Sequence, residues 1–473
     1  MSLSELLEIE IDISETRKSS LKQSPSTISI ITRQEIAKRK YLTLADTLMS
    51  IPGFDVQNTV IDRNVVTARG DLQNFYSNKV LLMINGIPSW QPTYGEGYLS
   101  RIDVNSIERI EIISGPSSVL YGTNAFIAVI NVVLRNQTNN IEASFSSDIN
   151  NSYRSSFLIS ESFNYLKFMV NFGTFHNRNN PIELKSANNP FYNGDSTFQF
   201  DNTYTQRKFT TTLSYKGHSL LLNNYENNFN YMGANHSYLS GGNNFVFDGG
   251  TLISYNSNHN LTNDLNFSSL LSYEFFKRDF ALSADRYTAI ELNSERVDSR
   301  LNLNYKPNDS WSFDLGANAE FNRSKEHNAI NPALDIKIRE NIPTNSNYYA
   351  TSVFGQIQYS YSFLNLQAGS RYTYNSIFGD NISSRFTSNF NINSSNVIKL
   401  IYAEAFRTPS LLELYFDHPT VIGNQNLNPE KNYSYEFSYL TTQDELYFQL
   451  TAYYQSIDNL IKRFTPETGP PSE

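Results

Sequence analysis

The sequence predicts a mainly β protein in which a small mixed α/β domain precedes a large antiparallel β-barrel that spans a membrane. Two observations lead to this fold class. The first 136 residues combine helix and strand patterns with glycine turns, whereas the later chain is rich in Asn, Ser, Tyr and Phe and alternates polar with apolar residues. The alternating segments often reach about ten residues, the length that a tilted strand needs to cross a bilayer core.

The composition narrows the class of protein. Of the 473 residues, 14% are aromatic, with 31 Tyr and 32 Phe, and only 18% are charged, so aromatic rings carry much of the apolar surface. No stretch approaches about 18 consecutive apolar residues, which excludes a helical membrane span. The net charge of −9 argues against a nucleic-acid partner. The lack of cysteine excludes disulfides and thiolate metal sites but leaves the compartment open.

The N-terminal stretch, MSLSELLEIEIDISETRKSS, lacks the basic region, the continuous apolar core and the small-residue cleavage site of a secretory signal. We therefore expect that, if the protein is exported, its signal peptide is missing from this sequence, either because the start codon is assigned too late or because the sequence is that of a mature form. A cytoplasmic protein is the plain alternative at this point.

The small domain begins with strand and helix signals. The stretch STISIITRQEI predicts a strand that runs into a helix, because Thr32 and Glu35 have the spacing of a capping box. A second helix is predicted in LTLADTLMSIPGF, where Leu44 and Leu48 share a face and the following Pro-Gly pair ends the helix.

Short strands complete this domain. VVTARG and KVLLMINGIP predict two strands, which end at Gly70 and at the turn signal formed by Asn85 and Gly86. RIEII and AVINVVL predict two more strands, on either side of the turn at Gly115 and Pro116. The segment SGPSSVLYG has neither the lysine of a phosphate-binding loop nor the glycine spacing of a dinucleotide site.

The second part of the chain alternates with a period of two. In WSFDLGANAEF the apolar and polar residues occupy opposite faces, and the polar face carries acids. The apolar face holds Trp311, Phe313, Leu315, Ala317, Ala319 and Phe321. A soluble sandwich also alternates, but its strands usually have about five or six residues. Aromatic residues at strand ends, such as Trp311, Tyr361 and Tyr454, fit the aromatic girdles of a membrane barrel.

Seven sequence blocks carry a family resemblance. In chain order they are SPSTISIITRQEI, LADTLMSIPGF, TARG, VLLMINGIP, ERIEIISGPSSVLYGTNAFIAVINVV, EAFRTPSLLELY and GNQNLNPEKNYSYEFSY. In order and spacing they resemble the plug and late-barrel motifs of TonB-dependent outer-membrane receptors. The resemblance extends over nearly the whole chain and is specific because seven ordered blocks contribute to it, whereas any one block alone is weak.

The resemblance implies a fold, a location and partners. In this family a 22-strand barrel in the outer membrane of Gram-negative bacteria encloses a globular plug, and the inner-membrane TonB complex supplies energy. The implied domains are a TonB-box and periplasmic extension in residues 1–14, a plug domain in residues 15–136 and a β-barrel in residues 137–473. The implied partners are the TonB complex, a chelated nutrient and outer-membrane lipid, with the receptor acting as a monomer.

The chain departs from the family pattern toward its C-terminus. We count about 17 or 18 candidate strands after residue 136, and the family's terminal aromatic strand is missing after ELYFQLTAYYQS. A barrel with missing strands leaves unpaired backbone groups in lipid, which is costly. We therefore expect a fragment, with a smaller closed barrel as the alternative. Ser114 stands where family members often have Arg, which puts an ion pair through that position in doubt.

The resemblance also names residues for energy coupling. The segment from Leu7 to Glu15 aligns with the TonB-box, a short extended peptide suited to binding by strand addition. A frayed terminus or an ordinary first strand is the alternative. The central residues of this segment are Ile9, Glu10, Ile11, Asp12 and Ile13.

Two further residues are expected to join the plug to the barrel. Arg69 matches a plug arginine that pairs with carboxylates of the barrel wall in this family, and we expect Glu436 to be its partner. The alternative is that each side chain belongs only to a solvated polar face inside the barrel.

The expected plug apex, DLQNFYSN and PSWQPTYGEGY, is rich in aromatic residues. Rings in Gly/Pro loops are a typical means of gripping an amphipathic chelate, while polar groups fix its orientation. We expect substrate contacts from Phe75, Tyr76, Trp90, Tyr94 and Tyr98. The alternative for each ring is that it serves the packing of the apex itself.

His418 brings haem into consideration. It lies between FRTP and NQNL, where haem receptors of this family carry an axial histidine, and imidazole is a good iron ligand. However, residues 1–136 contain no histidine for a second ligand, and both blocks also occur in non-haem members. A loop residue is therefore the preferred interpretation of His418. The remaining histidines, His176, His218, His236, His259 and His327, show no metal-binding spacing.

Taken together, these patterns predict active import. No catalytic motif is present, so we expect neither enzyme activity nor a cofactor nor a resident metal, and an outer-membrane hydrolase with a hidden Ser/His pair is a remote alternative. A passive porin or structural barrel needs neither a plug nor a TonB-box, so the first 136 residues favour import. We expect a ferric siderophore as the substrate, with haem and cobalamin as alternatives.

Overall fold

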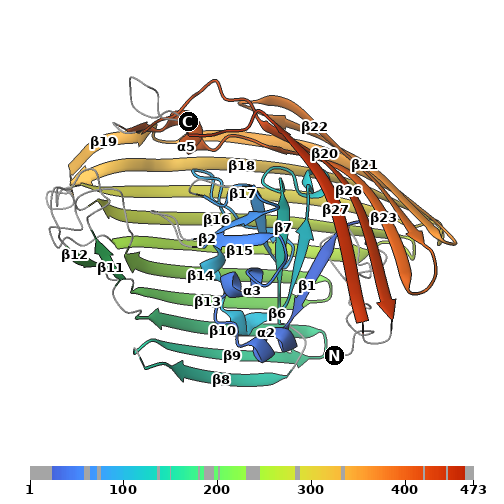
Figure 1. Ribbon diagram of the computed structural model, residues 1–473, viewed down its shortest axis with the longest axis horizontal. Helices are drawn as coiled ribbons and strands as arrows, with labels where there is room; N and C mark the ends of the chain where they lie inside the picture. The colour runs from blue at the N-terminus through green and yellow to red at the C-terminus, as the bar shows by residue number, and fades with distance from the viewer. Residues whose placement is uncertain are drawn as a thin grey trace.

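The computed structural model contains two main sheets (Figure 1). One is a five-stranded sheet in the N-terminal unit and the other a 16-stranded antiparallel sheet that follows it. The structure describes residues 24–57, 64–71, 76–135, 139–149, 151–178, 182–185, 197–200, 203–230, 245–282, 288–331, 336–418, 421–443 and 446–463. None of the described helices is long and apolar enough to cross a membrane.

The N-terminal unit is built from short elements. Its strands are β1 (Ile28–Thr32), β2 (Phe54–Gln57), β3 (Val65–Ala68), β4 (Val80–Ile84), β5 (Ile87–Pro88), β6 (Ile107–Ser114) and β7 (Ala128–Leu134). Its helices are α2 (Arg33–Arg39), α3 (Leu44–Leu48), η1 (Leu99–Arg101), η2 (Val104–Ser106) and α4 (Ser118–Tyr121). The sheet order is β1-β6-β7-β4-β5, with β4 and β7 parallel, and β2 pairs separately with β3.

Local sequence signals explain these helices and turns. Thr32 accepts a hydrogen bond from the backbone N–H of Glu35 over 3.3 Å where α2 begins. At the start of α3, Thr43 forms a reciprocal capping box with the residue three positions later. Asn85 and Gly86 have φ angles of 50° and 78°, which the tight turn between β4 and β5 requires. The predicted helices and strands of this unit are confirmed.

The large sheet follows the order of the chain. Its strands are β8 (Asn140–Ser147), β9 (Tyr153–Phe163), β10 (Leu166–Asn177), β13 (Tyr204–Tyr215), β14 (His218–Asn230), β15 (Phe245–Asn260), β16 (Leu265–Leu282), β17 (Thr288–Tyr305), β18 (Trp311–Asn331), β19 (Ile336–Ile342), β20 (Ser346–Tyr361), β21 (Leu364–Asn375), β22 (Gly379–Asn391), β23 (Asn396–Arg407), β26 (Glu430–Gln443) and β27 (Leu446–Asp458). Its connections contain the hairpin of β11 (Ile182–Lys185) and β12 (Thr197–Phe200), helix α5 (Leu411–Tyr415), and the pair β24 (Asp417–His418) and β25 (Val421–Ile422).

The large antiparallel sheet agrees with the expected fold class. Within the described residues the sheet has 16 strands, and four short strands lie in its connections. Short extended segments of the connections pair with each other instead of joining the sheet, as β11 does with β12 and β24 with β25. A period of two predicts an extended segment, but it does not reveal which partner that segment takes.

The alternation along each strand separates an apolar outer face from a polar inner face. In β18, Trp311, Leu315 and Phe321 are exposed, whereas Asp314 and Glu320 on the opposite face are buried. This arrangement inverts that of a soluble sheet, whose polar residues face outward. It is the pattern of a barrel that presents apolar side chains to lipid and encloses polar ones.

The two ends of the strands differ in their connections. At one end the turns are tight, and several use left-handed residues, including Asn164 (φ 53°), Lys216 (φ 44°) and Ser362 (φ 48°). At the other end lie the connections from β10 to β13, β14 to β15, β18 to β20, and β23 to β26, which carry extra elements or more than ten residues. In Figure 1 the labelled strands β11, β12 and β19, which belong to these connections, lie on the left-hand side. We call the two ends the short-turn end and the long-connection end.

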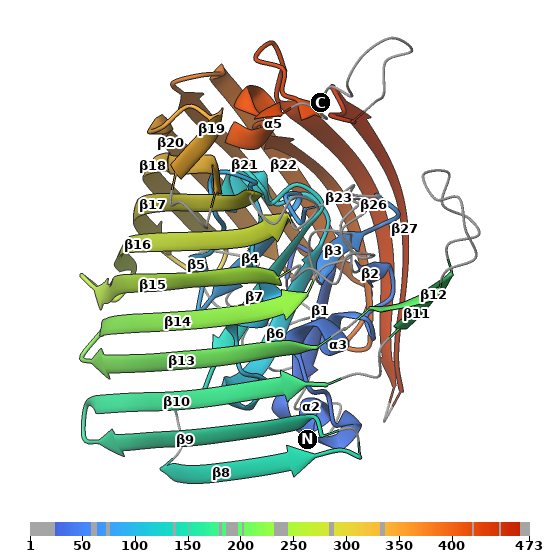
Figure 2. The same ribbon diagram turned by 90° about the vertical axis from the view of Figure 1, so that its left-hand side faces the viewer.

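The N-terminal unit lies on the concave side of the large sheet, as Figure 2 shows. Polar side chains of the wall bond directly to its backbone. Lys208 Nζ of β13 donates to the carbonyl of Ile102 over 3.0 Å, and Asn432 Nδ2 of β26 donates to the carbonyl of Phe126 over 2.7 Å. Among the described strands, β8 and β27 each pair on one side only, so they form the two edges of the sheet.

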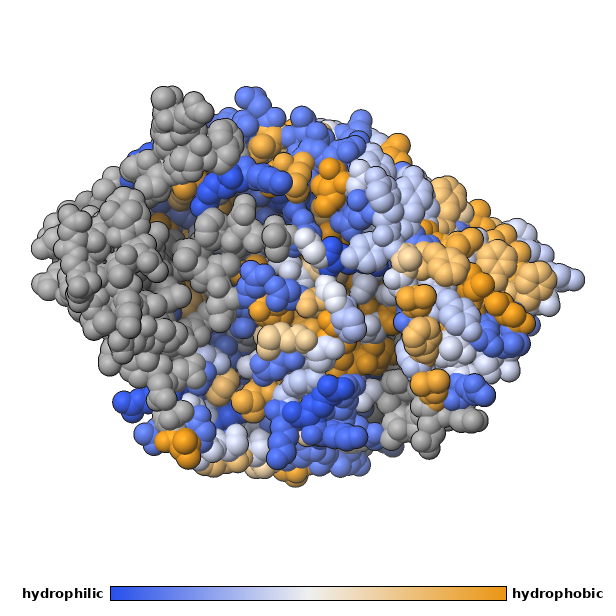
Figure 3. Space-filling view, viewed as in Figure 1, coloured by the Kyte–Doolittle hydropathy of each residue, from blue (hydrophilic) through white to orange (hydrophobic). Residues whose placement is uncertain are grey.

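The outer face carries bands of aromatic side chains. Near the short-turn end, the ring centroids of Trp311 and Tyr359 lie 4.7 Å apart, and those of Trp311 and Phe313 lie 5.9 Å apart. Figure 3 shows apolar side chains gathered over β22, β23, β26 and β27. Aromatic girdles at the level of the lipid headgroups are a feature of barrels that span the outer membrane.

Candidate functional site

A short, self-bonded loop places the tip of the plug at the long-connection end. The side-chain oxygen of Gln91 accepts hydrogen bonds from the backbone N–H groups of Thr93 and Tyr94, over 2.8 and 3.2 Å. The N–H of Gly95 donates to the carbonyl of Gln91 over 2.9 Å. Gly95 has a φ of 78°, and a Cβ there would meet Asn78 Cβ at 3.2 Å, so glycine allows the loop to close. The loop therefore holds Tyr94 in a fixed position.

Tyr94 is the centre of an aromatic cluster between plug and wall. Its ring stacks on that of Tyr76, with centroids 4.5 Å apart and 12° between the planes. Its hydroxyl lies 3.0 Å from Nε2 of His327, which is near the end of β18. The ring of Phe416, just after α5, meets His327 edge-on at 5.4 Å. We call these four residues the apex cluster.

A buried arginine lies beside the apex cluster. The guanidinium of Arg278, on β16, lies 5.4 Å from the ring centroid of Tyr94 and 5.2 Å from that of Tyr98. It donates to Oδ2 of Asp248 over 3.1 Å and lies 3.3 Å from Oε1 of Glu96. Burial raises the pKa of Tyr98 well above its usual value against the opposing effect of Arg278, so this hydroxyl stays neutral and donates to Glu96 over 2.7 Å.

Trp90 occupies a second contact between plug and wall. The guanidinium of Arg296, on β17, lies 4.8 Å from the ring centroid of Trp90. Arg296 also donates to Oδ2 of Asp298 over 2.9 Å and to the carbonyl of Pro88 over 3.2 Å. A cation over an indole face is favourable, and more so where water is excluded. This contact fixes the segment that leads into the apex loop.

A charged network positions helix α5, which Phe416 directly follows. Arg407, in the FRTP block, donates two parallel hydrogen bonds to Glu413 of α5, over 2.9 and 3.0 Å. It also donates to Glu430 at the start of β26 over 2.5 Å. Glu413 forms the capping box of α5 with Ser410. This geometry fixes the path of the β23–β26 connection above the plug.

The residues expected to bind substrate are placed as follows. Tyr76 is half-buried, whereas Trp90, Tyr94 and Tyr98 are 4%, 2% and 7% exposed and contact the wall. Phe75 lies outside the described residues. Of His418 only the backbone is described, and it pairs with Val421 in β24–β25. The TonB-box residues Ile9, Glu10, Ile11, Asp12 and Ile13 lie outside the described residues.

Three members of this region were not indicated by any local sequence pattern. His327, Phe416 and Arg278 come from the wall, more than 180 positions after Tyr94 in the chain. Their common feature is that each lies where a strand or helix meets a connection of the long-connection end. Among the described residues, no group of three or more His, Asp or Glu side chains is placed to hold a metal ion.

Arg69 and Glu436 form an ion pair between plug and wall. Nη1 of Arg69 lies 2.8 Å from Oε1 of Glu436, and the two side chains are 5% and 2% exposed. Nη2 of Arg69 donates to the backbone carbonyl of Ser114 over 2.7 Å. Ser114, which stands where family members often have Arg, therefore contacts Arg69 through its backbone. The ring of Tyr453, on β27, covers the guanidinium at 4.5 Å. Thr27 also donates to Glu436, over 3.2 Å.

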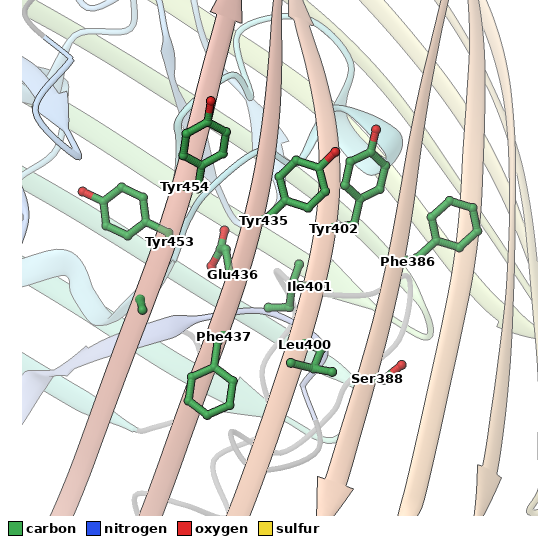
Figure 4. A pocket seen from close by; sticks show the side chains of 11 residues that line it. Phe386, Ser388, Leu400, Ile401, Tyr402, Tyr435, Glu436, Phe437, Tyr453 and Tyr454 are labelled. Carbon is green, nitrogen blue, oxygen red and sulfur yellow. The ribbon is translucent and has the colours of Figure 1, made fainter.

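A hollow of about 680 Å³ lies on the outer face, across β22, β23, β26 and β27 (Figure 4). Above it, one row of rings runs across the four strands, with neighbouring centroids 6.2, 5.0 and 6.4 Å apart. The row consists of Phe386, Tyr402, Tyr435 and Tyr454. Figure 4 shows the three tyrosine hydroxyls pointing the same way along the strands. Because this hollow opens on the apolar outer face, it does not belong to the apex cluster.

The family comparison agrees with this architecture. The description "TonB-dependent Receptor Plug Domain" matches residues 20–129, and "TonB dependent receptor-like, beta-barrel" matches residues 121–472. The chain is a TonB-dependent receptor. As a member of this family, the receptor is a protein of the Gram-negative outer membrane.

Individual relatives differ in the substrate that their names state. The receptor is 24% identical to the vitamin B12 transporter BtuB of Photobacterium profundum, over 94% of this chain and 69% of the relative. It is 32% identical to the iron-regulated outer membrane virulence protein of Vibrio cholerae, over 24% of this chain and 18% of the relative.

Solved structures share the fold of the receptor. The ferric enterobactin receptor PfeA of Pseudomonas aeruginosa, in complex with enterobactin, has a TM-score of 0.73 at 16% identity, over 94% of this chain and 73% of the other. The siderophore receptor PirA of Acinetobacter baumannii has a TM-score of 0.74 at 15% identity, over 98% and 74%. At these identities the likeness shows the fold alone.

Proposed function

We propose that the receptor imports a ferric siderophore and uses energy transmitted by TonB. The observation that carries this proposal is the apex cluster, in which Tyr76, Tyr94, His327 and Phe416 meet at the long-connection end. The aromatic faces, the hydroxyl of Tyr94 and the imidazole of His327 suit a ligand that combines flat apolar parts with hydrogen-bonding oxygens. A ferric chelate of an oxygen-rich siderophore has both properties.

The buried contacts of the plug support active import over passive diffusion. The wall holds the plug through Arg69 with Glu436, through Arg278 with Glu96, and through Arg101, which contacts Glu274. An open porin needs a free lumen, whereas here the plug occupies the concave side of the sheet. Passage of a nutrient therefore requires these contacts to rearrange, and that rearrangement requires energy. The segment around Ile11 is proposed as the TonB-box that receives it.

Cobalamin is the second candidate substrate. The vitamin B12 transporter of Photobacterium profundum aligns with 94% of this chain, which favours this substrate on sequence. Haem is the third candidate and rests on His418 alone. The domain limits at residues 14 and 136 remain part of the proposal, as does the monomeric state.

Intrinsic fluorescence offers a direct binding test, because the chain has only two tryptophans, Trp90 and Trp311. Trp311 lies on the outer face near the short-turn end, so Trp311→Phe leaves Trp90 as the single reporter between plug and wall. We expect a ferric siderophore to change the emission of this variant saturably. Trp90→Phe, which retains only Trp311, is the matched control and should respond much less.

The same titration distinguishes the candidate substrates. Purified receptor is titrated with a panel of ferric siderophores, with cyanocobalamin and with haemin. A saturable response to cyanocobalamin and to no siderophore would contradict the proposal and support the second candidate. A response to haemin alone would support the third.

A further inference from the structure

A cavity of about 280 Å³ lies between the plug and the barrel wall, on the short-turn side of the interior. On the plug side it is lined by Asn85 and Gly86 of the β4–β5 turn and by Leu120 at the end of α4. The wall contributes amide, hydroxyl and guanidinium side chains from β15 to β21. The polar members that matter here are Asn302, Asn318, Arg300 and Arg371.

Arg371 is the unusual member of this cavity. It is 2% exposed, yet among the described residues no carboxylate lies within 4.0 Å of its guanidinium. The groups that it contacts directly are uncharged. Nη2 donates to Asn318 Oδ1 over 2.9 Å, Nε donates to Thr373 over 3.2 Å, and the ring of Phe354 lies 5.7 Å away. By contrast, Arg101, Arg278, Arg296 and Arg407 are equally buried and each contacts a carboxylate.

The nearest acids are occupied by other arginines. Asp298 lies 2.9 Å from Arg296 and 3.1 Å from Arg300, and Glu320 lies 3.6 Å from Arg296. Among the described residues, Arg371 therefore has no carboxylate of its own, because Arg296 and Arg300 contact the two acids nearest to it. A buried charge without a counter-charge is costly.

The donors around Arg371 are fixed in orientation. Asn318 accepts from Arg371 with its oxygen and donates with its nitrogen to Asp298 over 2.6 Å. Gly122 permits the approach of α4, because a Cβ there would lie 3.2 Å from Arg371 Nη2. A planar guanidinium held in this way suits the paired oxygens of a phosphate or carboxylate.

We propose that this cavity binds a small oxyanion, a phosphate or carboxylate group, through Arg371 with help from Arg300. The volume is at the lower end of the range for ligand pockets, which fits a single anionic group and not a whole chelate. The site stands whichever nutrient the receptor imports. If the oxyanion is a group of the nutrient itself, the cavity is a transient binding site on the import path. This assignment to the import path rests on the proposed function.

Direct binding of inorganic phosphate tests the site. Purified full-chain receptor in detergent is equilibrated with radiolabelled phosphate at constant ionic strength. We expect saturable binding by the wild type and a loss of roughly tenfold or more in affinity for Arg371→Gln. Arg371→Lys keeps the charge but loses the planar pair of donors, so it should bind phosphate more weakly than the wild type and more tightly than Arg371→Gln. Lys306→Gln removes a positive charge from an exposed short turn and should bind like the wild type.

Two results would overturn the site. One is the absence of saturable phosphate binding by the wild type. The other is equal binding by Arg371→Gln. If Arg371→Gln fails to fold, Asn318→Leu serves as the second variant, because it removes the group that orients Arg371, and unchanged phosphate binding by it would equally overturn the site.

A second arm identifies the source of the oxyanion. If the nutrient supplies it, Arg371→Gln slows uptake while leaving nutrient affinity at the apex unchanged. If free phosphate supplies it, uptake by Arg371→Gln equals that of the wild type although phosphate binding is lost. Absence of uptake by the wild type would count against the proposed function and not against the oxyanion site.

Discussion

Arg69 of the plug and Glu436 of β26 are 367 positions apart in the chain, yet their side chains meet at 2.8 Å in a buried ion pair. The pair lies under the ring of Tyr453 and is linked through the carbonyl of Ser114 to the plug sheet. It joins the plug to the last two strands of the large sheet. A plug held in this way moves only when a buried pair separates.

The first prediction concerns this pair. Glu436→Gln should lower the free energy of unfolding by about 3–5 kcal/mol, because it leaves the charge of Arg69 buried without a counter-charge. Chemical denaturation of the purified receptor measures the change. The double variant Arg69→Gln with Glu436→Gln should lower the free energy of unfolding by less than the sum of the changes in the two single variants. Additive effects would show that the two side chains do not stabilise the plug through each other.

The second prediction concerns pH and Asp103, where η2 of the plug meets the wall. Burial opposes ionisation of Asp103, but Arg154, Lys208 and hydrogen bonds from Ser156 and Asn171 outweigh it and hold the pKa of this carboxyl below its usual value. The stability that Asp103 contributes is therefore present above its unfolded pKa of about 4 and is lost as the pH falls through the lower folded value.

Asp103→Asn should accordingly be less stable than the wild type near neutral pH, and the difference should shrink in acid. Denaturation at a series of pH values measures it. Asp264→Asn, at an exposed turn, is the control and should follow the wild type at every pH. A constant difference between Asp103→Asn and the wild type across the acid range would contradict the assignment.

The third prediction concerns Tyr94. Tyr94→Ala removes both the stacking on Tyr76 and the contact with His327, so we expect substrate affinity to fall by roughly tenfold or more. Tyr94→Phe keeps the ring and should lose less substrate affinity than Tyr94→Ala. The fluorescence of Trp90 reports both affinities. Unchanged binding by Tyr94→Ala would remove the apex cluster from the substrate site.

The fourth prediction concerns energy coupling. Ile11→Pro should abolish uptake and leave substrate binding nearly unchanged, because proline removes a backbone donor needed for strand addition to TonB. Ile11→Ala keeps the donor and is the matched control. Full uptake by Ile11→Pro would refute the TonB-box assignment, and so would a loss of binding.

The fifth prediction concerns haem. His418→Ala should change affinity for the substrate by less than roughly tenfold, about 1.4 kcal/mol, because a siderophore brings its own iron ligands. Absorption spectroscopy of the receptor with haemin tests haem as the alternative substrate. A Soret shift with the wild-type receptor that disappears with His418→Ala would favour haem instead.

The fold was predictable from the sequence because its signals are local. A period of two identifies strands such as Trp311–Asn331, and the capping residues Thr32 and Thr43 mark the helices of the plug. The partners of short segments such as β11 and β24 were not predictable, because each pairs within a connection and not with the large sheet. Strand pairing depends on the whole sheet and not on the segment alone.

The residues of the candidate site also differ in whether the sequence could predict them. Arg69 and Glu436 were named through motif resemblance, and the aromatic residues Tyr76 and Tyr94 through their glycine-rich and proline-rich surroundings. His327 was dismissed because no second ligand lies near it in sequence. Its contact with Tyr94 exists only because the plug lies against the end of β18, and no local pattern encodes that placement.

Uptake by living cells distinguishes TonB-driven import of iron from import of cobalamin. Iron-starved Gram-negative cells that carry this receptor and no other siderophore receptor are supplied with a siderophore loaded with radioactive iron, or with labelled cobalamin, in the presence and absence of TonB. We expect iron to accumulate only with both the receptor and TonB, and we expect no accumulation of cobalamin. Accumulation of cobalamin in place of iron, or equal entry of iron without TonB, would contradict it.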